Sequence, residues 1–170
     1  MARKKAVVEL VAKWDARMSK LVGHIFQVPV QEPYHTYAHF LADGSFAFYD
    51  NLTSEDTPDF AMLTAQRVLF RIHIMGLVFT QRARKWKDVG AWPIPEQLQQ
   101  SGVFCSRSIK GRDPETQEVL YDYYRSGESD EPVIISKEES ELLELSAVWN
   151  PLHISERLRQ HYQIMSPVGS

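Results

Sequence analysis

Two histidines set four residues apart, His35 and His39, are the first pair in this chain that could hold a metal ion. On a helix, that spacing would put both imidazoles on one face, where they could share zinc. The surrounding segment, Tyr34–Leu41, is instead rich in aromatic and β-favouring residues and predicts a strand. At about 3.3 Å per residue the two rings would then lie about 13 Å apart, and no third ligand is nearby in the sequence. We therefore expect no metal site, and two histidines on a half-exposed sheet face.

A catalytic nucleophile is the second possibility, because Cys105 could be activated by one of the scattered histidines. Those histidines are His24, His73, His153 and His161. Cys105 lies in an ordinary strand pattern, Val103–Ser106, in which a thiol packs as a small hydrophobe. The sequence contains no Gly-x-Ser-x-Gly elbow, phosphate-binding loop or dinucleotide fingerprint. We expect a protein without catalytic residues or cofactor, and keep as an alternative a small enzyme with a pocket lined by His35, Tyr37 and His39.

A basic stretch with an interleaved aromatic, Arg82–Lys87, could grip nucleic acid through phosphate contacts and stacking. The net charge of the chain, −3, opposes that role. We favour the other interpretation of this stretch, a solvated loop whose Trp86 packs into the core. A nucleic-acid-binding module that uses this loop and a basic N-terminal helix stays open as the second hypothesis, and it predicts salt-dependent binding.

Carboxylates gather in the third quarter of the chain, where residues 111–145 hold eleven acids and three bases, a net charge of −8. An acidic surface attracts basic partners and repels nucleic acid. From charge alone we favour the other interpretation, in which the same residues form an ordinary solvated surface on helix and loop. The contact hypothesis names seven carboxylates: Asp122, Glu128, Asp130, Glu131, Glu138, Glu139 and Glu141.

Apolar periodicity predicts the sheet that must position these groups. The expected strands are His24–Val30, Tyr34–Leu41, Phe46–Tyr49, Val68–Phe79, Val103–Ile109, Val119–Tyr124 and Val133–Ile135. Asp43-Gly44 is a strong hairpin signal, and residues 80–92 are expected to form an exposed loop or a short edge strand. The expected fold class is α+β, with a mostly antiparallel, strongly curved sheet or partly open barrel flanked by helices at both termini.

Capping signals mark the expected helices. An amphipathic pattern predicts a helix over residues 5–20, and Thr57-Pro58 predicts the start of a short helix that runs to Ala65. Ser136 and Glu139 fit a capping box at the start of a helix to Ala147, and Asn150-Pro151 begins a last helix. We expect one domain, with an N-terminal helix within 1–21, a sheet core over 23–135 and C-terminal helices over 136–163.

Composition bounds the class of protein. A chain of 170 residues with 44% hydrophobic and 24% charged residues is typical of one globular domain. One cysteine cannot form an internal disulfide, so nothing indicates an oxidising compartment. Charges interrupt the apolar pattern near the N-terminus and no apolar run reaches 18 residues, so neither a signal peptide nor a membrane span is expected. We expect a cytoplasmic protein.

Six short motifs follow one another at characteristic spacing: Gly23–Pro29, Tyr34–His39, Ala47–Asp50, Val68–Ile72, Lys85–Gly90 and Trp149–Leu158. In order and spacing they resemble the immunity protein 26 family of bacterial polymorphic toxin systems. The resemblance covers residues 23–110 best and does not extend to residues 111–148 or the N-terminal helix. Because these motifs are strand cores, the resemblance implies a shared fold more than shared chemistry.

This resemblance implies an immunity protein, which protects the producing cell by binding a cognate toxin domain, often a nuclease, and blocking it stoichiometrically. Such a protein is not an enzyme and needs no cofactor. The acidic surface suits the role, because it can mimic the phosphate backbone and accelerate association with a basic nuclease. The toxin-binding residues of the family are not carried over, because interfaces diverge with their toxins. The seven carboxylates therefore stand as a hypothesis from charge.

Overall fold

The computed structural model describes residues 18–74, 86–127, 131–146 and 148–164. It is an α+β structure, mostly β, as expected. Its elements, in chain order, are η1 (Ser19–Leu21), β1 (His24–Gln31), β2 (Tyr34–Phe40), β3 (Ser45–Tyr49), α2 (Phe60–Thr64), β4 (Val68–Ile74), β5 (Lys87–Ala91), α4 (Glu96–Gln99), β6 (Phe104–Arg112), β7 (Val119–Ser126), β8 (Val133–Ile135), α5 (Lys137–Glu141), β9 (Glu144–Leu145), β10 (Val148–Trp149) and α6 (Pro151–His161).

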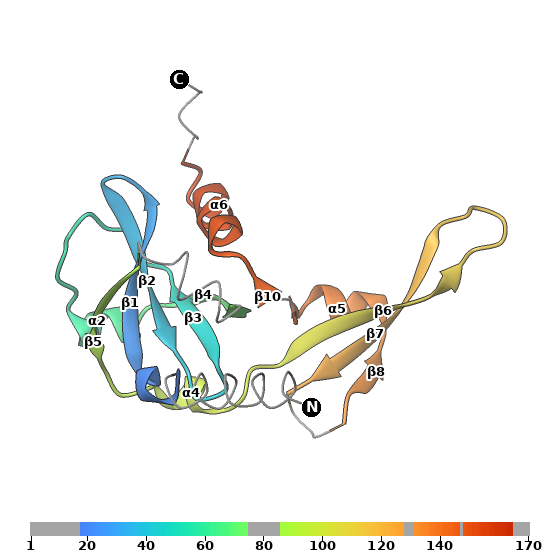
Figure 1. Cartoon of the computed structure of the whole chain (residues 1–170), viewed down its shortest axis with the longest axis horizontal. Helices are drawn as coiled ribbons and strands as arrows, with labels where there is room; N and C mark the ends of the chain where they lie inside the picture. The colour runs from blue at the N-terminus through green and yellow to red at the C-terminus, as the bar shows by residue number, and fades with distance from the viewer. Residues whose placement is uncertain (1–17, 75–85, 128–130, 147, 165–170) are drawn as a thin grey trace, which may run out of the picture.

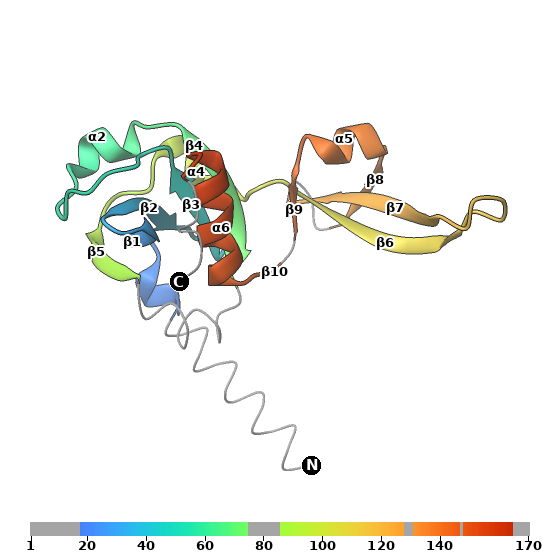
Figure 2. The same cartoon turned by 90° about the horizontal axis from the view of Figure 1, so that it is seen from above.

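The strands form two separate sheets. The first has the order β10-β4-β3-β2-β1-β5, and the second has the order β8-β7-β6-β9. Neighbouring strands are antiparallel except β10 beside β4 and β9 beside β6, which are parallel. Figures 1 and 2 show the first sheet with α2, α4 and α6 as one body, and the second sheet with α5 extending from its side. We call these two parts the body and the arm.

This division corrects the expectation of one curved sheet or partly open barrel over residues 23–135, since neither sheet is closed into a barrel. The physical reason lies in β6, which is buried at Phe104 and Cys105 but exposed from Arg107 to Lys110. The middle of β6 carries Arg107, Ser108 and Lys110, with Ile109 as its one apolar side chain, so the strand lacks the continuous apolar faces that the body strands bury. It pairs with β7 and leaves the body.

The body sheet is covered on both faces. Phe26, Val28, Phe46 and their neighbours on one face pack with Ile154 and Leu158 of α6. The alternate residues form the other face and pack with Leu63 of α2 and Leu98 of α4. Because side chains alternate along a strand, burial on both faces explains why all five positions of β3 are buried.

Several local signals are confirmed. Asp43-Gly44 forms the β2–β3 turn, with Gly44 at a φ of +80°. The capping box is present at α5, and the Asn150 side chain accepts a hydrogen bond from the Leu152 amide at the start of α6. Short-range chemistry therefore decides these boundaries.

Other boundaries differ from the expectation. α2 begins at Phe60 and not at Pro58, because the Asp59 carboxylate accepts the Met62 amide and acts as the N-cap. α5 ends at Glu141, well before Ala147, and the segment 136–163 includes β9 and β10 between its two helices. The helix expected over residues 5–20 lies mostly outside the described residues. Of the helices described, none is long and apolar enough to cross a membrane.

His39 is a fully buried polar group at the centre of the body. Its Nδ1 lies 3.0 Å from the Tyr49 hydroxyl and its Nε2 lies 3.1 Å from the Gly23 carbonyl oxygen. Burial lowers the pKa of His39 below its ordinary value of 6.5, although hydrogen bonds to the backbone of Gly23 and Trp92 partly oppose this. The neutral imidazole is therefore the form that the fold accommodates.

We expect this group to make the free energy of unfolding depend on pH. A histidine with a lowered pKa in the folded state contributes stability above its ordinary value of 6.5 and loses it as the pH falls through the folded value. Urea unfolding of the wild type should give a free energy that decreases between pH 7 and pH 5. His39→Gln should remove most of that decrease and cost about 1–3 kcal/mol at pH 7, because it disturbs two buried hydrogen bonds.

His153→Gln is the matched control, because His153 is exposed on α6. It should leave both the stability and its pH dependence close to those of the wild type. An equal decrease with pH in wild type and His39→Gln would contradict the role given to His39.

Candidate protein-binding arm

The arm is built on a long antiparallel hairpin. β6 and β7 pair over their whole lengths, β8 pairs with β7, and β9 pairs with the start of β6. The connecting turn is fixed by Asp113, whose Oδ1 accepts hydrogen bonds from the amides of Glu115 and Thr116 at 2.9 and 2.8 Å. These bonds lower the pKa of Asp113, the Thr116 amide contributing most. A tightly closed turn holds the strand register along the hairpin.

One face of the hairpin is aromatic and apolar. Ile109 lies opposite Tyr121 and Arg107 lies opposite Tyr123, so these four side chains share a face. The Arg107 guanidinium lies 4.8 Å from the centre of the Tyr121 ring, and the centres of the Tyr121 and Tyr123 rings are 6.4 Å apart. Ile109 is 72% exposed. We call these four residues the tyrosine face; Tyr and Arg are the residue types that most often anchor protein interfaces.

The structure gathers the predicted carboxylates that it describes on the arm. Asp122 lies on β7 and pairs with Lys110 at 3.4 Å, and Glu131 precedes β8. Glu138, Glu139 and Glu141 lie together on α5, which contacts β7.

Not every predicted carboxylate is equally available to a partner. The Glu139 side chain accepts the Ser136 amide at 3.0 Å, so it stabilises α5. Asp122 already has a cationic partner. Glu128 and Asp130 lie outside the described residues. On α5, Glu138 and Glu141 are therefore better suited than Glu139 to meet another protein, and Glu131, before β8, is exposed as well.

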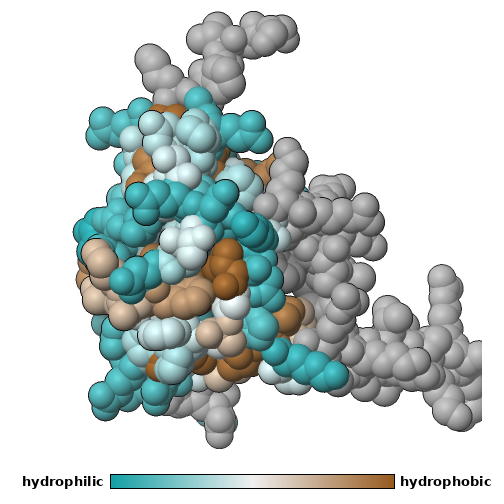
Figure 3. All heavy atoms as spheres, turned by 90° about the vertical axis from the view of Figure 1, so that its left-hand side faces the viewer, coloured by the Kyte–Doolittle hydropathy of each residue, from teal (hydrophilic) through white to brown (hydrophobic). Residues whose placement is uncertain are grey.

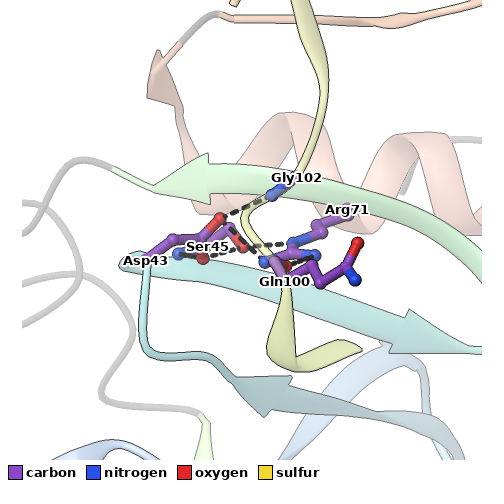
Figure 4. Close-up of polar contacts among 5 residues, drawn as sticks. All are labelled: Asp43, Ser45, Arg71, Gln100 and Gly102. Atoms are coloured by element: carbon purple, nitrogen blue, oxygen red, sulfur yellow. Dashed lines mark hydrogen bonds and ion pairs between the residues drawn. The ribbon is translucent and has the colours of Figure 1, made fainter. Parts of the chain in front are cut away.

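The chain enters the arm through an ionic network. The Arg71 guanidinium of β4 donates to the Asp43 carboxylate at 2.7 Å, to the Ser45 hydroxyl at 2.7 Å and to the Gln100 carbonyl oxygen at 2.8 Å. Asp43 also accepts the Gly102 amide at 3.0 Å, and Figure 4 shows these contacts converging on the segment that leads into β6. The side chains of Arg71 and Asp43 are only 14% and 15% exposed. The network fastens the root of the arm to the β2–β3 turn.

Asp43 is charged in this setting. Burial opposes its ionisation, but hydrogen bonds from Gly102, Ser45 and Arg71 outweigh burial and hold the pKa of Asp43 below its ordinary value of 3.8. The carboxylate is thus stabilised as an anion by the groups that it holds together.

A second guanidinium fastens the arm where the chain returns to the body. Arg157 of α6 donates to both oxygens of Glu144 in β9, at 2.9 and 2.6 Å. Its guanidinium also lies 4.0 Å from the centre of the Phe70 ring and 5.2 Å from that of Trp149. A bidentate pair of this kind fixes direction as well as distance.

Two glycines, Gly102 and Gly127, pack closely against each other at the root of the arm. A Cβ on Gly127 would lie 2.0 Å from the Gly102 carbonyl oxygen, and the φ of Gly127 is +106°. No side chain fits at position 127, so glycine there is what allows the backbones of Gly102 and Gly127 to lie so close together.

The histidines and the cysteine are placed as core or surface groups. The rings of His35 and Tyr37 are buried side by side, and both contact the Glu55 carbonyl oxygen, at 3.0 and 2.9 Å. Of the other histidines, His24 pairs with Asp88, His161 with Asp50, and the ring of His73 contacts Phe104. Cys105 is buried, and burial raises the pKa of its thiol. Within the described ranges, no three His, Cys, Asp or Glu side chains are grouped to hold a metal ion.

The basic stretch retains one described aromatic, Trp86, which is 9% exposed and contacts the rings of Phe46 and Phe48. This is the core position that we favoured, and a ring packed there is not available to stack on bases. Lys87 begins the edge strand β5, and Arg82, Arg84 and Lys85 lie outside the described residues.

Sequence reasoning missed the tyrosine face and the ionic network. The alternation of Tyr121 and Tyr123 with Asp122 could have indicated the first. The second had a signal in Arg71, which stands among the apolar residues of β4, since a guanidinium in a buried strand requires a carboxylate partner.

Comparison of the chain with protein-family models, with curated proteins and with solved structures found no match.

We expect Asp43→Asn to cost about 3 kcal/mol of unfolding free energy at neutral pH, because it leaves the Arg71 guanidinium without its anion. A carboxylate with a lowered pKa contributes stability above its ordinary value of 3.8 and loses it as the pH falls through the folded value. The difference between wild type and Asp43→Asn should therefore be constant above pH 5 and shrink below pH 4. Urea unfolding across this range measures it.

Asp50→Asn is the control, since Asp50 pairs with Arg67 at the surface and should cost less than about 1 kcal/mol. Equal losses for the two variants would remove the special role of the Asp43 network.

We expect Gly127→Ala to destabilise the root of the arm by about 3 kcal/mol or more, through backbone strain and overlap with the Gly102 carbonyl. Gly111→Ala, in the same hairpin, meets nothing within 4 Å and should change stability by less than about 0.5 kcal/mol. Urea unfolding and amide hydrogen exchange in β6 and β7 would compare them. A Gly127→Ala variant as stable as Gly111→Ala would show that the root is not closely packed.

Proposed function

We propose that this chain is an immunity protein that binds a cognate toxin domain, expected to be a nuclease, and neutralises it by forming a stoichiometric complex. In this role it acts in the cytoplasm and needs neither cofactor nor catalytic residues. The proposal rests on the arm, a sheet whose hairpin is only partly buried and carries apolar and aromatic side chains.

The observation that carries the proposal is the exposure of large apolar residues on the arm. Six such residues are exposed there: Ile109, Leu120, Val133, Ile134, Leu142 and Leu145. Ile134 is 71% exposed and Leu142 is 86% exposed. Ile109 lies on the tyrosine face, and Leu120 and Ile134 lie on the opposite face of the sheet, so both faces of the arm offer exposed apolar side chains to a partner protein.

The position of the arm in the sequence gives further support. The motifs that resemble the immunity protein 26 family lie in the body strands β1 to β5 and in β10 and α6. The arm, apart from β6, lies in residues 111–148, which that resemblance does not cover. A body that keeps one fold and an arm that varies is what is expected when each immunity protein must recognise its own toxin.

Charge supports a basic partner. Nine of the eleven acids of residues 111–145 are among the described residues, and all nine lie on the arm, where Glu138 and Glu141 are exposed on α5. A nuclease toxin is basic where it holds nucleic acid, so these carboxylates would steer it and the tyrosine face would supply apolar contact.

The proposal predicts that this chain, expressed together with the product of the gene immediately upstream, forms a tight 1:1 complex and rescues cells that the upstream product alone kills. Pull-down and a growth assay would measure the two effects. A stable chain that neither binds nor rescues would contradict the proposal.

Within such a complex, Glu138→Lys combined with Glu141→Lys should raise the Kd at least tenfold, mainly through slower association at low salt. Glu32→Lys combined with Glu96→Lys, on the body, makes the same change in net charge. Glu96 begins α4 just as Glu138 lies in the first turn of α5, so the cost to the helix is matched as well. Equal affinities for the two double variants would remove the acidic part of the contact hypothesis.

A further inference from the structure

A hollow of about 290 Å³ lies in the body, at the end away from the arm. It is open to solvent and is lined by β2, by the segment after β3 and by α2. Its lining includes Tyr37, Leu52, Glu55, Asp59, Met62 and Leu63. Figure 3 shows this end of the body, where apolar side chains gather among hydrophilic ones.

Internal hydrogen bonds hold the hollow open. The carbonyl oxygen of Glu55 is fixed by the Tyr37 hydroxyl at 2.9 Å and contacts His35 Nε2 at 3.0 Å. Thr53 and His35 exchange backbone hydrogen bonds at 2.9 and 3.0 Å, and the Thr53 hydroxyl accepts the Glu55 amide. The wall is therefore tied to β2 at two points, Thr53 and Glu55, so a ligand would find it already formed.

The floor and the rim differ in chemistry. Tyr37 and Leu63 on the floor are 1% and 2% exposed, whereas Glu55 and Asp59 stand at the exposed rim. The lining contains two carboxylates and no lysine, arginine or histidine. One oxygen of Asp59 accepts the Met62 amide at 3.1 Å, which leaves the other oxygen facing no hydrogen-bond donor among the described residues.

The carboxylates near the rim interact electrostatically with Tyr37 on the floor. The pKa of Tyr37 is raised, first by burial and then by the negative charges of Asp56 and Glu55. Burial opposes any charge at the floor, whereas the negative charges near the rim disfavour an anion in the hollow and attract a cation to the rim.

We propose that this hollow binds an organic cation, a primary ammonium or guanidinium group on a short apolar chain. The apolar chain would lie against Leu52 and Leu63, and the cation would meet the carboxylates of Glu55 and Asp59 at the rim. A volume of about 290 Å³ is at the lower end for ligand pockets and suits a small ligand such as a short alkyl amine. The inference concerns the body and does not depend on the toxin-binding role of the arm.

Either a free small amine or a lysine or arginine side chain of another protein could supply this chemistry. Butylamine and agmatine represent the first source, and lysine capped at both ends by acetyl and methylamide groups represents the second. Binding would be followed by ¹H–¹⁵N chemical shifts of the whole chain at pH 7 and low salt. The amines should bind with a Kd in the millimolar range and shift the amides around Tyr37 and within residues 51–66.

Butanol is the neutral counterpart of butylamine and should bind at least tenfold more weakly. Glu55→Gln combined with Asp59→Asn should weaken amine binding by at least tenfold, and the asparagine oxygen can still cap α2. Glu115→Gln combined with Glu118→Gln, at the turn of the arm, changes the net charge equally and should leave amine binding as it is.

The probes also separate the two sources. Binding of capped lysine as well as butylamine would assign the hollow to a protein side chain, and binding of butylamine and agmatine alone would assign it to a small amine. Equal binding of butanol, shifts confined to residues other than the lining around Tyr37 and residues 51–66, or unchanged affinity in the Glu55/Asp59 variant would overturn the proposal.

Discussion

The ion pair between Arg71 and Asp43 is the contact on which the placement of the arm depends. A guanidinium in a strand whose neighbours are buried must be neutralised, and Asp43 is held in reach by the tight turn between β2 and β3. The same carboxylate then accepts the Gly102 amide, so the chain leaves the body at a point set by that turn. A local hairpin signal and a buried charge together determine where a distant segment begins.

Arg157 gives the arm a second fixed point. Its bidentate contact with Glu144 holds β9, and its stacking on Phe70 and Trp149 holds the guanidinium itself. The Arg71–Asp43 network lies before β6 and the Arg157–Glu144 pair follows β8, so the arm is attached to the body at two points and cannot rotate about one of them. A surface that is oriented before its partner arrives loses less conformational freedom on binding, which favours affinity.

Local features of this fold could be predicted from the sequence because their causes lie within a few residues. Asp43-Gly44, the Ser136 and Glu139 capping box and Asn150 each satisfy backbone groups beside them. The division into two sheets could not be predicted, because β9 and β10 are two residues long and form only when distant strands are in place. In the candidate site, the clustering of acidic residues could be recognised from the sequence, whereas the tyrosine face could be recognised only from the register of β6 and β7.

The two shortest strands have a consequence for synthesis of the chain. β9 completes the arm sheet and β10 completes the body sheet, and α6 then covers one apolar face of the body with Ile154 and Leu158. A nascent chain that emerges from the ribosome from its N-terminus therefore cannot close either sheet until residues 144–158 have been made. Until then Phe26, Phe46 and Phe48 have no cover from α6, and the growing chain presents an apolar surface of the kind that chaperones bind.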